Sequence, residues 1–523
     1  MRVADYAMQF VASLGVRHVF LVVGGGAMHL NDALARCPGL EYVCVHHEQA
    51  AAIAAEAYAK ATDNLGVAMV TTGPGGTNAI TGLAGAWLDS TPCLFLSGQV
   101  KRADRMYKAD GTPLGVRQRG IQEVDIVTIV RPLTKYAVTV TDPGSIRYHL
   151  GKAVHLARTG RPGPVWIDIP IDVQAAPIDP EKLEEFTAGD ATSQETGGLG
   201  DSRTLRSIGH QVAEPPSPQV GLSSAAFAVK SLIERLNSAE RPLLLIGNGV
   251  RLAGAVGELH EVLRLLNIPV ASTWLAMDLV GDEEPLFVGR PGTVAPRAPN
   301  FALQNCDFLL AVGARLDLPV VGWSASQFAR GAYKAMVDVD PAELAKLEGV
   351  MDVGICSDAG DFLRELLRQR EAVQARDRKC WLQLCEEWKQ RYPLVQPGHR
   401  GPEGRVSIYN LAEVIGAEVS PDDQIVSGSS GSAIEIFLLA YRARAGQRVF
   451  HTAALGAMGF GLPASIGVCL ASGRQRTVCV DGDGGFQFNI QELATVARLG
   501  LPIKFFILNN RGYASIRASP GSL

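Results

Sequence analysis

The chain has 523 residues, of which 47% are hydrophobic and 20% are charged, and its formal net charge is -4. This length exceeds what one hydrophobic core usually holds and indicates about three domains. The near balance of charges excludes a strongly basic nucleic-acid-binding protein, so we expect no nucleic-acid partner.

The cysteines and the apolar stretches indicate where in the cell the protein is located. Nine cysteines form no CxxC pair, and an odd number of this kind is typical of a reduced, cytoplasmic protein. Residues 1–16 alternate polar and apolar residues and lack the apolar core of a signal peptide. Residues 453–473 are uncharged but interrupted by glycines and a proline, which favours a buried loop and helix over a membrane span. We therefore expect a cytoplasmic protein without membrane contact.

The first 175 residues alternate short apolar runs with helical patterns. This alternation is typical of a parallel sheet covered by helices on both faces. Residues 1–175 are expected to form the first domain, closed by a strand at residues 162–170, and the polar residues 176–225 are expected to form a linker. The earlier strands are expected at residues 18–23, 42–45, 67–72 and 92–97.

A second α/β domain is expected at residues 226–375, followed by a third at residues 376–523. A charged helix at residues 361–391 leads from one to the other. The predicted fold is therefore α/β, with three successive doubly wound parallel-sheet domains. The expected strands of the second domain are residues 241–250, 268–273, 307–316 and 334–341, and those of the third include residues 477–480 and 503–508.

Polar residues end two strands of the third domain. Asp483 follows the first strand, and Asn509 and Asn510 follow the second. Parallel strands end at the same edge of a sheet, so these residues are expected to meet there. Their oxygens suit Mg²⁺, and flanking glycines let backbone N–H groups approach a diphosphate. The alternative is a tight turn and a strand end without a ligand. The glycines are Gly482, Gly484 and Gly485.

The helix between these two strands has its own pattern. Asn489 and Glu492 resemble a capping box at its start. One apolar face follows at helical spacing, formed by Ile490, Leu493, Ala494 and Ala497.

The GDG motif, followed after 24 residues by NN, resembles the diphosphate signature of thiamine-diphosphate enzymes. Further stretches along nearly the whole chain resemble acetolactate synthases and their relatives in the same order. The resemblance implies pyrimidine-binding, central and diphosphate-binding domains, and a homodimer or homotetramer with active sites between subunits. The stretches include VHHEQAAAIAAEAYAK (45–60), TTGPGGTNAITGLAGAWLDSTPCLFLSG (71–98), IQEVDIVTIVRPLTKY (121–136) and LGAMGFGLPASIG (455–467).

The resemblance assigns cofactor roles to residues. Glu48 matches the glutamate beside the aminopyrimidine ring, although an acidic residue in a first helical turn also stabilises a helix. Met458 matches the bulky residue wedged between the cofactor rings, although methionine is commonly core filler. Asp483 and Asn510 would bind Mg²⁺ by their side chains and Gly512 by its carbonyl. The resemblance implies further cofactor contacts at Thr72, Pro74, Asn78, Ser430, Ser432, Gly456, Gly482, Gly484, Gly485 and Tyr513.

The resemblance also assigns a substrate side. Gln122 matches a substrate-side glutamine and Lys135 a lysine nearby, although either could be an ordinary surface group. Gly25 and Gly26 would let the backbone approach the reacting carbon, although turn geometry alone would also explain two glycines.

The chain departs from biosynthetic acetolactate synthases around the expected acceptor. GIQE replaces AFQE, so Gly120 and Ile121 are expected to leave room near Gln122. Ser519 stands near the position of a tryptophan that shapes the acceptor pocket in those enzymes. The departures make a larger carbonyl acceptor reasonable, such as the keto sugars used by some relatives.

Two further departures concern FAD and the C-terminal region. GARLD and DVDPAE lie along a bound FAD in relatives, but Leu318 and Pro319 follow where charged residues are common, so FAD occupancy stays open. The chain continues for 13 residues after Asn510, and the C-terminal cap of relatives is not among them. A site without a cap would be open to water, which would hinder carboligation.

We expect an enzyme that decarboxylates a 2-oxo acid, pyruvate, on thiamine diphosphate and transfers the two-carbon unit to a carbonyl acceptor. The alternatives are a 2-oxo acid decarboxylase, a flavin-linked oxidase of the same family, and an inactive cofactor-binding paralogue acting as a scaffold.

Overall fold

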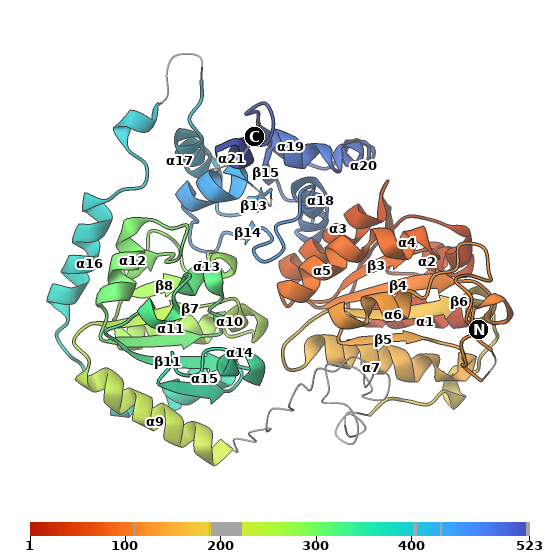
Figure 1. Cartoon of the computed structure of the whole chain (residues 1–523), viewed down its shortest axis with the longest axis horizontal. Coiled ribbons are helices and arrows are strands. Elements are labelled where there is room, and N and C mark those ends of the chain that lie inside the picture. The colour runs from red at the N-terminus through yellow and green to blue at the C-terminus, as the bar shows by residue number, and fades with distance from the viewer. Residues whose placement is uncertain (109, 188, 190–221, 401–404, 429–430, 519–523) are drawn as a thin grey trace. The chain divides into compact units, whose positions relative to one another are not determined.

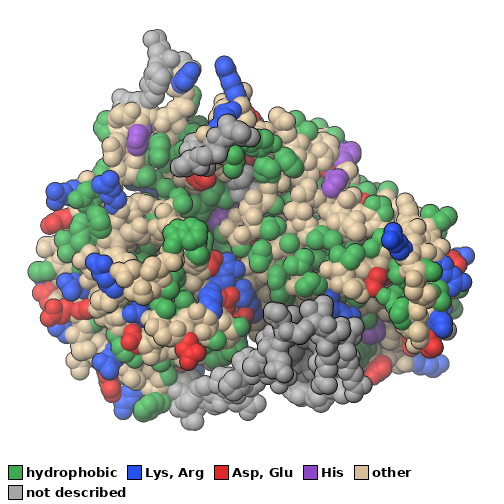
Figure 2. Space-filling model, viewed as in Figure 1, with side chains coloured by type: hydrophobic (Ala, Val, Ile, Leu, Met, Phe, Trp, Pro, Cys, Tyr) green, Lys and Arg blue, Asp and Glu red, His purple; other side chains and the backbone are tan. Residues whose placement is uncertain are grey.

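A computed structural model confirms the predicted fold class (Figure 1). Three parallel-sheet α/β domains follow one another along the chain, with sheets of six, six and four strands. Acidic and basic side chains alternate over the visible surface without a large area of one sign (Figure 2). The structure describes residues 1–108, 110–187, 189, 222–400, 405–428 and 431–518.

By its internal contacts the chain divides into two compact units, which are described separately. Most of the predicted linker, residues 190–221, lies outside the described residues. The first unit comprises Met1–Val212, Gly428–Ser430 and Phe450–Tyr513, and the second comprises Ala213–Ser427, Gly431–Val449 and Ala514–Leu523.

The first sheet has the strand order β2-β1-β3-β4-β6-β5, and all its neighbouring strands are parallel. Strands β1, β3, β4 and β6 are fully buried and mostly apolar, as expected where helices cover both faces. Strand β6 is the last strand of this domain in chain order, as predicted. Strand β5, which forms the edge of the sheet beside β6, was not predicted. The strands are β1 (His18–Leu21), β2 (Glu41–Cys44), β3 (Gly66–Val70), β4 (Cys93–Gln99), β5 (Tyr136–Thr139) and β6 (Val165–Pro170).

Helices cover both faces of this sheet (Figure 1). Helices α1, α2 and α7 contribute to the core on one face, and α3, α5 and α6 to the core on the other. The helices are α1 (Val3–Ser13), η1 (Gly25–Ala27), α2 (Met28–Arg36), α3 (Glu48–Thr62), α4 (Pro74–Asn78), α5 (Ile80–Leu88), α6 (Ile126–Val130), α7 (Ile146–Arg158) and α8 (Ile171–Gln174).

The central sheet has the order β12-β11-β10-β7-β8-β9 and is also parallel. One core lies between it and helices α9, α11 and α15, and a second involves α12 and α16. The strands are β7 (Pro242–Ile246), β8 (Val270–Ser272), β9 (Phe287–Gly289), β10 (Phe308–Val312), β11 (Tyr333–Asp338) and β12 (Val353–Cys356). The helices are α9 (Leu222–Ser238), α10 (Gly249–Leu252), α11 (Val256–Leu266), α12 (Arg297–Asn305), α13 (Leu318–Val321), α14 (Pro341–Ala345), α15 (Ala359–Arg368) and α16 (Lys379–Arg391).

The predicted single helix at residues 361–391 is wrong. Helix α15 ends at Arg368, and α16 begins at Lys379. The Asp377 carboxylate accepts a hydrogen bond from the Lys379 N–H, which satisfies a backbone donor at the start of a new helix. The charged sequence pattern therefore continues through residues 369–378, where the chain leaves one helix before it begins the next.

The third sheet has the order β14-β13-β15-β16. Strands β15 and β16 are parallel, with Gly482 paired to Leu508 at the end of the register. The strands are β13 (Gln424–Ser427), β14 (Val449–Phe450), β15 (Thr477–Gly482) and β16 (Ile503–Leu508). The helices are α17 (Ile408–Glu418), the π-helix η11 (Ala433–Leu438), α18 (Gly461–Ala471), α19 (Asp483–Gln487), η12 (Ile490–Glu492), α20 (Leu493–Leu499) and α21 (Ala514–Ala518).

Helix α18 confirms the buried helix predicted within residues 453–473, since Gly461–Leu470 are all buried, while residues 453–455 before it are exposed. The helix packs closely on α3 because small residues face each other. A Cβ atom at Gly467 would lie 2.1 Å from the Ala54 carbonyl oxygen. Among the described residues, no helix is both long and apolar enough to cross a membrane.

The change Gly467→Ala is expected to lower the free energy of unfolding by about 1–3 kcal/mol, because one added methyl group must separate two packed helices. Gly416→Ala provides the matched control, since the added Cβ would lie 3.9 Å from the Tyr441 ring in ordinary contact. That control should raise the free energy of unfolding by up to about 1 kcal/mol. Urea unfolding followed by circular dichroism checks both values, and equal effects would contradict the packing argument.

Candidate functional site

Glu48 is the first residue of α3 and is 9% exposed. The preceding His47 caps the helix by accepting a hydrogen bond from the Gln49 N–H at 3.1 Å. Asn78 Nδ2 donates to Glu48 Oε2 at 3.0 Å, and the Cβ position of Gly75 lies 3.6 Å from Oε1. One carboxylate oxygen is thus held by the protein, while the other accepts no hydrogen bond from the described residues.

The turn after β3 packs against the predicted glycine loop. Thr71 Oγ1 accepts a hydrogen bond from the Gly26 N–H at 3.1 Å, and Thr72 Oγ1 donates to the Gly98 carbonyl at 3.0 Å. A Cβ at Gly26 would lie 2.1 Å from Thr72 Oγ1, whereas nothing lies within 4 Å of the Cβ position of Gly25. Packing therefore requires glycine at residue 26, and exposed Gly25 leaves open space beside the loop.

Gln122 is exposed and has a φ of +63°, which is uncommon for a residue with a side chain. Its carbonyl oxygen lies 2.3 Å from the Cβ position of Gly73, so only glycine fits in the turn that it covers. The predicted extra room at Gly120 is absent, because a Cβ there would lie 2.9 Å from the Asp104 carbonyl oxygen. Ile121 points to solvent and is 89% exposed.

Glu123, which the sequence analysis missed, organises the loop that carries Gln122. Its buried carboxylate accepts hydrogen bonds from the backbone N–H groups of Met106, Arg119 and Gly120. Such charge-assisted bonds are roughly twice as strong as neutral ones. The signal in the sequence was an acidic residue beside a predicted site residue, but only the fold shows its partners.

Asp483 begins α19 directly after β15, and its carboxylate contacts the loop that follows β16 at Gly512. Its Oδ1 accepts from the Gly484 N–H at 3.0 Å, and its Oδ2 accepts from the Gly512 N–H at 2.9 Å. Asn510 places its side-chain Oδ1 in a buried position. A Cβ at Gly484 would lie 2.7 Å from the Tyr513 ring, so this glycine is needed for the loop to close.

The Glu48 and Asp483 regions are distinct clusters within the first unit. Glu48 lies with Gly75 and Asn78, whereas Asp483 lies with Gly484 and Gly512. Among the described residues, no hydrogen bond of Glu48 reaches the Asp483 cluster. The structure therefore forms two separate clusters, one around Glu48 and one around Asp483.

Residues 451–460 form the loop that carries the predicted cofactor residues Gly456 and Met458, and this segment is called the Met458 loop. Gly456 and Gly459 adopt φ values of +62° and +87°. Asn489 Nδ2 donates to the Gly459 carbonyl at 2.8 Å. Met458 is half-buried, which leaves part of its side chain available for a ligand.

The predicted capping box is wrong. The Asn489 side chain binds the Met458 loop, and Glu492, which is fully buried, accepts from the His46 N–H at 2.8 Å and from Thr495 Oγ1 at 2.8 Å. Glu492 thus connects the start of α20 to the chain two residues before Glu48. It is a further residue that the sequence analysis did not single out as part of the site.

Helix α20 and the turn η12 before it are oriented opposite to their sequence pattern. The polar residues Glu492 and Thr495 are buried, whereas Ile490 and Leu493 of the predicted apolar face are 47% and 39% exposed. Ala494 and Ala497 are exposed as well.

Four other predicted residues lie outside the two clusters or outside the described residues. Ser430 lies outside the described residues, as does Ser519. Ser432 is the residue before the π-helix η11 in the second unit. Lys135 Nζ donates to the carbonyls of Thr159 and Arg161 at 2.6 and 2.7 Å, which gives this lysine a structural role.

A buried charge cluster lies at the C-terminal end of α3. Lys60 Nζ donates to Glu56 Oε1 at 2.7 Å and to Asp89 Oδ2 at 2.9 Å. Burial raises the pKa of Glu56 to about 7, although Lys60 opposes the shift, and Asp89 adds to it. Burial opposes the charge of Lys60, but Asp89 and Glu56 raise the pKa of this lysine further, so it stays charged.

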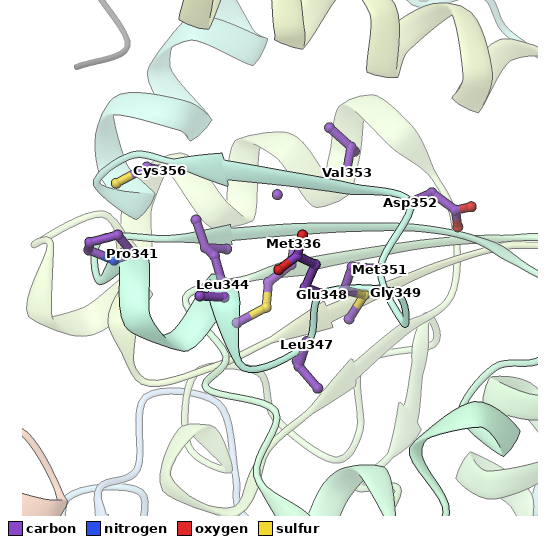
Figure 3. Close-up of a pocket in the computed structure, with 12 residues that line it drawn as sticks. Met336, Pro341, Leu344, Leu347, Glu348, Gly349, Met351, Asp352, Val353 and Cys356 are labelled. Atoms are coloured by element: carbon purple, nitrogen blue, oxygen red, sulfur yellow. The ribbon is translucent and has the colours of Figure 1, made fainter. Parts of the chain in front are cut away.

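The central domain contains a separate cavity of about 320 Å³ beside α14 and β12 (Figure 3). Met336, Leu344, Leu347 and Met351 give it an apolar wall, and Glu348 and Asp352 are its acidic residues. None of its lining residues is basic, so this cavity does not suit the diphosphate of a flavin. The predicted FAD segment DVDPAE reaches it only through Pro341, the first residue of α14.

Comparisons with known protein families match each of the three domains. The model of the thiamine pyrophosphate enzyme N-terminal TPP binding domain matches residues 1–129, that of the central domain matches residues 229–366, and that of the C-terminal TPP binding domain matches residues 429–521.

Acetolactate synthases are similar over nearly the full chain. The acetolactate synthase of Arthrospira platensis is 32% identical over 512 residues, which cover 96% of this chain and 81% of the relative. Acetolactate synthase isozyme 3 large subunit of Escherichia coli K12 is 32% identical, covering 97% of this chain and 82% of the relative. The acetolactate synthase large subunit of Lactococcus lactis is 31% identical, covering 98% and 81%.

The change Glu56→Gln is expected to flatten the dependence of stability on pH. The pKa of Glu56 rises in the folded protein from its ordinary 4.5 to about 7, so its stabilising contribution is complete below about pH 4.5 and is lost as pH rises through 7. Wild-type protein should lose on the order of 2 kcal/mol more than the variant between about pH 5 and 8. Urea unfolding at several pH values measures this difference, and parallel curves for the two proteins would contradict it.

Proposed function

The chain belongs to the thiamine pyrophosphate enzymes, in their acetolactate synthase-like group, and we propose that it decarboxylates pyruvate and transfers the two-carbon unit to a carbonyl acceptor. The observation that carries the proposal is the closure of the Asp483 cluster by the Gly512 N–H, in the same compact unit as the buried Glu48 carboxyl. A phosphate-bearing, metal-dependent cofactor and an acid that activates it need these two features.

Mg²⁺ fits the Asp483 cluster by its donor set. Among the described residues, no three His, Cys, Asp or Glu side chains are grouped to hold a metal ion. A cation there would take oxygen from Asp483, from the buried Asn510 Oδ1 and from the Gly512 carbonyl, which are the hard ligands that Mg²⁺ prefers. The Gly485 N–H, at the start of α19, would approach the diphosphate, whereas the Gly484 N–H donates to Asp483 Oδ1.

Glu48 would serve as the acid beside the cofactor. When bound, thiamine diphosphate supplies the electron sink that decarboxylation of a 2-oxo acid requires. Glu48 is shielded from water, and Asn78 fixes its Oε2, so Oε1 can exchange a proton with a ring nitrogen placed against it. Thr72, Pro74, Gly456, Met458, Gly482 and Tyr513, all in the first unit, complete the proposed cofactor contacts.

The acceptor side would lie at Gln122 and the glycine loop. Gln122 exposes its side chain beside the turn that carries Asn78, and open space surrounds the Cβ position of Gly25. Gly26 would place its backbone beside the same space. The space beside Gly120 is already occupied by neighbouring atoms. A larger acceptor would therefore have to use the space next to exposed Ile121.

We also propose a homodimer or homotetramer with active sites between subunits. Exposed apolar side chains occur beside site residues, at Ile121, Ile490 and Leu493. A second copy would remove them from water, and each buried side chain of this kind contributes about 1.5–3 kcal/mol. Light scattering of purified protein tests this proposal, and a monomer at micromolar concentration would contradict it.

Two further proposals concern FAD and the compartment. FAD is a candidate second cofactor along residues 312–317 and 338–343 of the central domain, and the absorbance spectrum of the purified protein tests its presence. The cysteines are all free, which suits the reducing cytoplasm. Cell fractionation tests that location.

The change Glu48→Gln is expected to lower the turnover of pyruvate by about 10²–10⁴-fold while binding of thiamine diphosphate and Mg²⁺ is kept, because the amide cannot exchange the proton. Proton NMR of pyruvate incubated with enzyme, Mg²⁺ and thiamine diphosphate measures turnover. Acetolactate or acetoin supports carboligation, whereas acetaldehyde alone or unchanged pyruvate would contradict the proposed reaction. The exposed Glu41→Gln change is the matched control and should leave the rate unchanged.

The change Asp483→Asn is expected to weaken Mg²⁺-dependent binding of thiamine diphosphate by about tenfold or more, because a metal loses its anionic ligand. Isothermal titration calorimetry with and without Mg²⁺ measures the effect. Asp422→Asn makes the same chemical change at an exposed residue and should bind normally. Equal affinities for both variants would contradict a metal at Asp483.

A further inference from the structure

We propose that Asp89 and Lys60 are positioning residues that hold the Met458 loop in the conformation that receives the cofactor. The inference rests on the proposed function, because that function gives Met458 its contact with thiamine diphosphate. It assigns a purpose to a buried charge cluster that otherwise lies outside the two clusters of the candidate site.

The two side chains bind the beginning of the Met458 loop through its backbone. Asp89 Oδ1 accepts a hydrogen bond from the Ala454 N–H at 3.2 Å. Lys60 Nζ donates to the His451 carbonyl at 3.2 Å, and to Asp89 Oδ2 at the same time. Asp89 is 3% exposed, so its carboxylate is buried, although Ala454 itself lies in the exposed part of the loop.

The end of the loop is held as well. Lys60 Nζ lies 5.9 Å from the centre of the Phe460 ring, and Asn489 Nδ2 donates to the Gly459 carbonyl at 2.8 Å. Phe460 and Asn489 are buried, whereas Leu455 in the middle of the loop is 37% exposed. The loop is therefore held on both sides of Gly456 and Met458.

The charges explain why this anchor resists opening. Moving the loop would leave the Asp89 carboxylate and the Lys60 ammonium buried with fewer partners, and an unsatisfied buried charge is costly. Lys60 stands in the last turn of α3, the helix that begins with Glu48. The same helix therefore carries Glu48 at its first residue and contacts the Met458 loop through Lys60 in its last turn.

The change Asp89→Ala tests the proposal, because it removes the acceptor for Ala454 and leaves Lys60 balanced by Glu56. Hydrogen–deuterium exchange of the protein without cofactor should be about tenfold faster in residues 452–460, and the Kd for thiamine diphosphate with Mg²⁺ should rise about tenfold. Asp89→Asn keeps an oxygen acceptor for the loop and should remain within about threefold of wild type in both measurements.

Leu150→Ala is the control for general destabilisation, since Leu150 is fully buried in the core on the opposite face of the sheet. It should lower stability without changing exchange in residues 452–460. The proposal is overturned if Asp89→Ala keeps exchange and Kd within about twofold of wild type, or if Leu150→Ala matches its effects. Wild-type protein that binds no thiamine diphosphate would instead refute the proposed function, while the exchange of the loop would still test the anchor.

Discussion

The register of β15 with β16 is the constraint on which the candidate site depends. Because Gly482 pairs with Leu508, the residues after both strands leave the sheet at the same edge. The hydrogen bond from Gly512 to Asp483 then fixes the loop that follows β16. A slip of one residue in this pairing would turn the side chains to the opposite face of the sheet. The backbone pairing of β15 with β16 therefore decides which side chains can meet at the candidate site.

Helix α3 combines three requirements in one element. Its alanine-rich surface lets α18 approach so closely that Gly467 leaves no room for a methyl group. Its first residue is the buried Glu48, and its last turn carries Lys60 within a buried charge cluster. Close packing makes the helix rigid, and rigidity is what an acid needs if it must meet a ligand at a fixed distance. The small residues are thus as necessary to the site as the carboxylate itself.

The sequence predicts most of the buried strands because they are largely apolar runs, and it places two strand ends at one sheet edge because the strands are parallel. It does not predict β5, β9 and β12, which form sheet edges and are not buried along their whole length. The contacts of buried polar groups also escape prediction. Glu492 binds the backbone of His46, which is 446 residues away in the chain, and Asp89 binds that of Ala454, 365 residues away. The spacing of Asn489 and Glu492 instead predicted a local capping box, but in the structure both side chains bind residues that are distant in the chain.

Helix α20, with the turn η12, has a consequence for anyone who engineers this chain. Its polar residues face inward because Glu492 and Thr495 satisfy each other and His46, so its apolar residues Ile490 and Leu493 face outward. Charged substitutions at those two residues would improve colloidal solubility without disturbing the interior. They would also remove the apolar surface on which the proposed assembly of subunits depends. On this helix, solubility of the isolated chain and formation of a complete active site oppose each other.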